Sequence, residues 1–85
     1  MTESLSKLEQ LRSDVHGIDL KIQSLLEDRF SKVEKISVIK EELGLPIHIP
    51  EVEEAKLASL SPMLRCLFSR IFELSRLNQE MKRKH

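Results

Sequence analysis

Residues 24–46, SLLEDRFSKVEKISVIKEELGLP, have the spacing of a helix with a cation on its apolar side. Between residues 11 and 43, apolar residues recur at alternating gaps of four and three positions, and this spacing is typical of one face of a helix. Arg29 and Lys32 occupy two positions in the middle of this row. We therefore predict one long helix whose core-facing row carries charge. The apolar members of the row, called the apolar stripe below, are Leu11, Val15, Ile18, Ile22, Leu25, Ile36, Ile39 and Leu43.

The sequence predicts an all-α fold with three helices. The first is expected over about residues 5–43, because Gly44 and a proline two residues later form an ordinary helix stop. A second helix is expected over about 50–60, since proline suits the first position of a helix. A serine and a proline then predict a third helix over about 62–82. The periodicity of this chain predicts no strand.

Composition and length indicate one domain, residues 1–85. Apolar residues make up 40% and charged residues 33%, which is typical of a folded, soluble chain. The zero formal net charge argues against a protein that neutralises nucleic-acid phosphates. The absence of a long apolar run or a basic-then-apolar leader predicts neither a membrane span nor a secretory signal. The lone Cys66 favours a reducing cytoplasm and is expected to be a small core residue.

The length of the first helix predicts a homodimer. About 39 helical residues make a rod of roughly 58 Å, whereas a compact globule of this size is roughly 30 Å across. About half of the helix would therefore protrude, together with its part of the apolar stripe. A second copy related by a two-fold axis is the simplest cover for that surface.

The cations of the first helix predict an anion site. A charge on an inner face needs a counter-charge. Lys40 lies eleven residues after Arg29, so the two face within about 20° of each other and are separated by about 16 Å of helix rise. Their long side chains can converge on an anion. Arg12 is rotated from Arg29 by about 100°, so we expect it to reach the ligand of the partner across an antiparallel dimer.

The third helix adds a hydrogen-bonding face. Its apolar row of Leu64, Phe68 and Phe72 continues into Ser75 and Gln79. A simpler interpretation stays open for these polar residues, which often line helices without any function. Arg29 could likewise pair with neighbouring acids, namely Glu27, Asp28 or Glu34.

Metal and cofactor sites are not predicted. The three histidines lack metal-ligand spacing and are expected at the surface. With two glycines, the chain has no glycine-rich phosphate loop. The histidines are His16, His48 and His85.

The segment LRSDVHGIDLKIQSLLEDRF (11–30), with Lys40 and the turn LGLPI (43–47), resembles the all-helical chorismate mutase family. That family has L-R-x-x-I-D-x-I-D-x-x-I-x-x-L-L-x-x-R on its first helix, then I-x-x-x-K and a G-x-P turn. Ser75 and Gln79 match its S-x-x-x-Q arrangement, so the resemblance spans nearly the whole chain. The other matching residues are Arg12, Ile18, Asp19, Leu25, Leu26, Arg29, Lys40 and Pro46.

The resemblance implies an intertwined homodimer that rearranges chorismate, a dicarboxylate, to prephenate without a cofactor, in phenylalanine and tyrosine biosynthesis. Arg29 and Arg12 of the partner subunit would each bind a carboxylate. Lys40 and Gln79 would donate to the ether oxygen, and Ser75 would lie at the pocket edge.

The sequence departs from the family pattern at the start of the second helix. Ile49 stands where the family has an acid or amide, and Val52 stands where it has an arginine. Glu53 matches the family acid that accepts a hydrogen bond from the substrate hydroxyl. Lys56, one turn after Val52, is a candidate replacement cation. The segment between Glu53 and Ser75 is also shorter than in typical members.

Two alternatives stay open. Isochorismate-pyruvate lyases share the scaffold and a similar set of cations, although the connection EELGLPIHIP is more similar to that of the mutases. The chain could also be a mutase-like helical module that regulates or scaffolds another enzyme. The substitution Arg29→Leu would distinguish this module from an enzyme, because a scaffold should become more stable whereas an enzyme should lose its activity.

Overall fold

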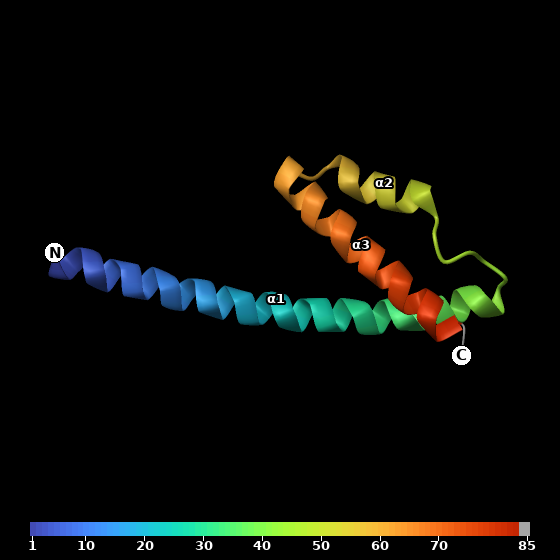
Figure 1. Cartoon of the computed structure of the whole chain (residues 1–85), viewed down its shortest axis with the longest axis horizontal. Coiled ribbons are helices and arrows are strands. Elements are labelled where there is room, and N and C mark those ends of the chain that lie inside the picture. The colour runs from blue at the N-terminus through green and yellow to red at the C-terminus, as the bar shows by residue number, and fades with distance from the viewer. Residues whose placement is uncertain (84–85) are drawn as a thin grey trace. The chain divides into compact units, whose positions relative to one another are not determined.

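The computed structural model describes residues 1–83, and these form an all-α structure of three helices (Figure 1). Helix α1 spans Thr2–Glu42, α2 spans Pro50–Ala58 and α3 spans Pro62–Arg83. The predicted three helices with a long first one are confirmed, with end points that differ by no more than a few residues. The expectation for His85 falls outside the described residues. Within residues 1–83, no helix is both long and apolar enough to cross a membrane.

The chain divides into two compact units, Met1–Ser31 and Lys32–His85, and α1 contributes to both. The described part of the first unit is a single stretch of helix. Its five stripe residues, from Leu11 to Leu25, are each between 47% and 67% exposed. Their apolar surface is thus largely uncovered by the chain itself.

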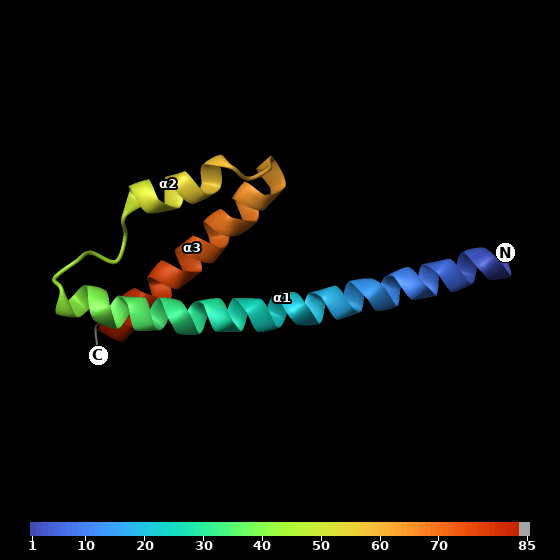
Figure 2. The same cartoon turned by 180° about the vertical axis from the view of Figure 1, so that it is seen from behind.

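In the second unit, α3 packs beside the last turns of α1 and beside α2, as both views show (Figures 1 and 2). Within the single chain the apolar stripe does not face a core here, because Ile36, Ile39 and Leu43 are exposed. The buried residue of α1 is Ser37, at 7% exposure. Successive residues of a helix are separated by about 100°, so the face that α3 covers is a different one from the stripe.

The buried apolar residues of the described chain are Ile71 and Phe72 on α3. The ring of Phe68 meets that of Phe72 edge to face, with centroids 6.0 Å apart. Cys66 is exposed, so its prediction as a core residue is wrong. It precedes the buried Ser75 by nine residues, which places it about 180° around α3.

The end of α1 is fixed by Gly44, whose φ is 70°. The Gly44 N–H donates to the Glu41 carbonyl at 3.1 Å, and the Leu45 N–H donates to the Lys40 carbonyl at 2.7 Å. This pair of bonds is the Schellman arrangement, which needs a left-handed residue that glycine adopts without strain. The predicted helix stop is confirmed, and it sets where the connection to α2 begins.

Helix α2 is short and begins with a proline at its first turn, as predicted. Ile49 occupies its N-cap position and provides no side-chain cap. At the other end, Arg65 Nε donates to the carbonyls of Leu57 at 3.1 Å and Leu60 at 3.0 Å. The Leu57 carbonyl also accepts from the Leu60 N–H at 3.1 Å. The two bonds of Arg65 therefore tie the end of α2 and the residues after it to the first turn of α3.

Candidate functional site

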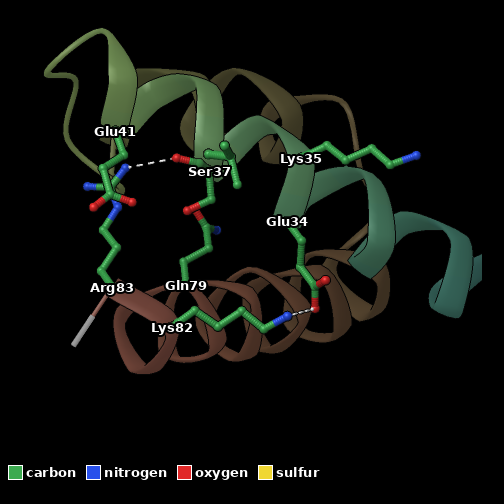
Figure 3. A pocket seen from close by; sticks show the side chains of 8 residues that line it. Glu34, Lys35, Ser37, Glu41, Gln79, Lys82 and Arg83 are labelled. Carbon is green, nitrogen blue, oxygen red and sulfur yellow. Dashed lines mark hydrogen bonds and ion pairs between the residues drawn. The ribbon is translucent and has the colours of Figure 1, made fainter. Parts of the chain in front are cut away.

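A cavity of about 310 Å³ lies in the second unit between the last turns of α1 and the last turns of α3 (Figure 3). This volume is at the lower end of the range for small-molecule sites. Figure 3 shows Gln79 reaching from α3 toward Ser37 on α1, whereas Lys35 points away. The residues that line the cavity are Glu34, Lys35, Ser37, Val38, Glu41, Gln79, Lys82 and Arg83.

Two polar atoms on residues that line this cavity are buried without a hydrogen-bond partner among the described residues. One is the acceptor Gln79 Oε1, and the other is the donor Arg83 Nε. A buried polar atom without a partner costs about 1–3 kcal/mol. A water molecule or the polar groups of a ligand would relieve that cost, so these two atoms are candidates for ligand contacts.

The predicted site residues of α3, Ser75 and Gln79, are each 5% exposed. Ser75 Oγ donates to the Ile71 carbonyl at 2.9 Å, and Gln79 Nε2 donates to the Ser75 carbonyl at 3.2 Å. Both bonds run to the carbonyl four residues earlier in the same helix. The amide nitrogen of Gln79 carries two N–H donors, so the bond to the Ser75 carbonyl leaves one of them for a ligand.

Lys40 is half-buried, and its Nζ donates to the Ile47 carbonyl at 3.1 Å. The bond holds the connection between α1 and α2 close to the end of α1. A lysine ammonium has three N–H donors. Two of them are not used by this bond and can serve an anion.

Glu53 on α2 lies in a cluster with Arg76 on α3 and His48. The Arg76 Nη1 atom is 2.5 and 2.7 Å from the two carboxylate oxygens of Glu53. His48 Nε2 lies 3.5 Å from Glu53 Oε1. The side chains of Arg76 and Glu53 are 25% and 24% exposed, so this ion pair is largely shielded from solvent. Glu53 is thereby held in one place between α2 and α3.

A third charged contact joins α1 to α3 beside the cavity. Glu34 Oε1 accepts hydrogen bonds from Lys82 Nζ at 2.6 Å and from Asn78 Nδ2 at 3.2 Å. The Lys82 bond, followed by the Asn78 bond, lowers the pKa of Glu34 below its usual value. The carboxylate is therefore ionised at neutral pH and holds the two helices together.

The eight predicted site residues are divided between the units. Arg12 and Arg29 lie on the part of α1 in the first unit, and the others lie in the second. Within the second unit, Gln79 lines the cavity and is hydrogen-bonded to Ser75. Val52 is exposed on α2. The members of the second unit are Lys40, Ile49, Val52, Glu53, Ser75 and Gln79.

Three polar residues at or near these contacts were missed by the sequence predictions: Ser37, Arg76 and Arg83. Ser37 gave a local signal, because it is a small polar residue three positions before Lys40 in an otherwise apolar segment. The two arginines gave no local signal, because their contacts join residues that are far apart in the sequence. Arg76 is 23 positions from Glu53, and Arg83 is 46 positions from Ser37. In the part of the chain that the structure describes, no group of three His, Cys, Asp or Glu side chains could hold a metal ion.

Two of the three known proteins compared with this chain are named as chorismate mutases. Over 49 residues it is 39% identical to a bifunctional chorismate mutase/prephenate dehydratase of Aquifex aeolicus, covering 58% of this chain and 14% of that protein. Over 50 residues it is 38% identical to a chorismate mutase of Methanocaldococcus jannaschii, covering 59% of this chain and 50% of that protein. Over 55 residues it is 34% identical to a T-protein of Enterobacter agglomerans, covering 65% of this chain and 15% of that protein.

The matched stretch thus spans at most half the length of these relatives. No solved structure is significantly similar to the chain. The family described as chorismate mutase type II matches residues 11–80, which include every predicted site residue and parts of all three helices. Because this match covers most of the sequence, the chain belongs to the chorismate mutase type II family.

Proposed function

We propose that this chain catalyses the rearrangement of chorismate to prephenate. The observation that carries the proposal is the family match over residues 11–80. In this reaction the ether C–O bond breaks while a C–C bond forms within the same molecule, so no group is transferred to the protein. The protein has to hold the reactive conformer and stabilise the negative charge that grows on the ether oxygen.

The proposed roles follow from the donors that each residue offers. Arg29 and Arg12 of the partner subunit bind the two carboxylates. Lys40 donates to the ether oxygen with an N–H that the Ile47 carbonyl does not use. Gln79 donates to the same oxygen with the N–H of its Nε2 that the Ser75 carbonyl does not use. Because these contacts strengthen as charge develops, they accelerate the step and do not only bind the substrate.

The proposed active form is an intertwined homodimer in the cytoplasm. Support comes from the apolar stripe, whose residues in both units stay exposed in the single chain. At about 25 cal/mol per Å² of apolar surface, covering such a row with a second copy is strongly favourable. Arg12 belongs to the same helix and would enter the site of the partner from there.

The experiment that tests the function is an incubation of the purified protein with chorismate and, separately, with isochorismate, followed by NMR. Prephenate from chorismate is the expected product. Salicylate and pyruvate from isochorismate would instead assign the chain to the lyases. If the folded protein converts neither compound, the proposed function is overturned and the interaction-module alternative is favoured. Arg29→Leu is the control, since it must abolish any turnover that belongs to this site.

A further inference from the structure

We infer that Arg76 is a substrate-binding residue that supplies, from α3, a cation for a substrate carboxylate near the start of α2. This inference rests on the proposed function. Val52 occupies the place on α2 where the resemblance implies an arginine, and Glu53 follows it directly. The guanidinium of Arg76 contacts the Glu53 carboxylate. A cation therefore reaches this region of α2 from the opposite helix.

The donor pattern of Arg76 leaves room for a second carboxylate. Both contacts with Glu53 are made by one nitrogen, Nη1. Within residues 1–83, no hydrogen bond from Nε or Nη2 of Arg76 is seen. Those two nitrogens form one edge of the guanidinium fork, which is the edge suited to a bidentate carboxylate. One arginine can thus keep Glu53 in place and bind an anion.

The position of Arg76 on α3 agrees with this role. It follows the buried Ser75 directly, and it lies about 60° around the helix from Gln79. At 25% exposure its side chain is half-buried, so its charge is less screened than that of a fully solvated arginine. It therefore sits at the edge of the face that carries the two predicted α3 site residues.

The other cations near α2 are poorer candidates. Lys56 is exposed in the last turn of α2. Arg65 is committed to the carbonyls at the end of α2. Arg70 is 61% exposed and pairs with Glu73 at 2.9 Å. Arg76 is the cation whose charge is both shielded and close to Glu53, which favours it over the earlier candidate Lys56.

The first test compares Arg76→Met with Arg70→Met, a matched removal of an exposed arginine on the same helix. Arg76→Met should raise KM for chorismate roughly 10- to 100-fold, the effect of losing a charged hydrogen bond, while kcat changes little. Arg70→Met should stay within about twofold of the wild type. Arg76→Lys should fall between, because it keeps the charge and loses the fork. Circular dichroism establishes that each variant is folded.

A second comparison separates substrate binding from a role in which Arg76 only holds Glu53. In a Glu53→Gln background, a merely holding role predicts no further effect of Arg76→Met. Substrate binding predicts a further rise of KM, again roughly tenfold or more. Adding Val52→Arg to Arg76→Met should recover about tenfold in kcat/KM, because the cation returns from α2. An unchanged KM in Arg76→Met, or no further effect in the Glu53→Gln background, overturns the inference.

Chorismate binding is measured in parallel by titration calorimetry, so that the two proposals fail separately. Wild-type turnover with an unchanged KM in Arg76→Met overturns the role of Arg76 alone. Wild-type binding without turnover overturns the proposed function, and the change of Kd in Arg76→Met then decides the role of Arg76. A wild type that neither binds nor converts chorismate overturns both.

Discussion

In the first unit of the chain the apolar stripe of α1 is exposed, whereas in the second unit three of the most buried side chains are polar. Those three are Ser37, Ser75 and Gln79, each between 5% and 7% exposed. An ordinary small domain buries its large apolar residues first. Here the chain covers these hydrogen-bonding groups with its own helices and leaves the apolar stripe exposed. The comparison teaches that two of the predicted site residues, Ser75 and Gln79, are also among the most buried positions of the described chain.

The largest expected effect comes from placing charge on the stripe in the first unit. Ile18→Asp should weaken the proposed dimer by roughly 3–6 kcal/mol, because one apolar side chain per copy no longer gains from burial. Sedimentation at several concentrations should then show a shift from two copies to one. Ser24→Asp, about 120° further around α1, is the control and should stay dimeric. A dimeric Ile18→Asp would mean that the stripe is not the interface.

The substitution Gln79→Leu removes a polar side chain from the buried face of α3. Activity should fall by about 10²–10³ in kcat, the usual effect of losing one donor to a developing oxyanion. Stability to urea should be unchanged or higher, because the unpaired Oε1 disappears. Asn78→Leu is the control: this variant loses the hydrogen bond from Asn78 to Glu34, but its kcat should stay the same. If Gln79→Leu keeps full activity, Gln79 has no part in the reaction.

The two glycines sharpen the comparison, since one lies in each unit. Gly44→Ala should destabilise the chain by about 1–2 kcal/mol, because φ is 70° there and an alanine is strained. Gly17→Ala should stabilise it by about 1 kcal/mol, because it lies inside α1 with open space around an added Cβ. Urea unfolding measures both. Equal signs for the two variants would contradict the turn geometry at residue 44.

The smallest expected effect is the pH dependence of the contact between α1 and α3. The pKa of Glu34 is lowered in the folded chain from its usual value of 4.5, so its stabilising contribution is full above that unfolded value. The contribution should disappear as the pH falls through the lower, folded pKa. The difference in unfolding midpoint between wild type and Glu34→Gln should therefore shrink from pH 6 to pH 3. A constant difference would show that ionisation of Glu34 is not involved.

Local sequence predicted those parts of the fold that depend on neighbouring residues. Periodicity gave the three helices, and Gly44 and Pro50 marked the end of α1 and the start of α2. Spacing along α3 also placed Ser75 and Gln79 on one face, and both are buried. In each case the interacting groups are within one or two helical turns, where backbone geometry fixes their relation.

The parts that sequence did not predict depend on how separate helices pack. Periodicity identifies the more apolar face of α1, but it does not tell whether α3 or another chain covers that face. The face that α3 covers carries Ser37 and lies about 100° from Ile36. The contact of Glu53 with Arg76 likewise follows from the packing of α2 on α3. No residue spacing encodes that contact.

The exposed thiol of Cys66 has a practical consequence for every measurement of association. It is the one cysteine in the sequence, and it lies on the side of α3 that faces away from Ser75. Air oxidation can join two such thiols and produce a covalently linked pair that has nothing to do with helix packing. Sedimentation samples therefore need a reducing agent or Cys66→Ser. The same thiol accepts a single spin label per chain, so electron resonance can report the spacing of two copies directly.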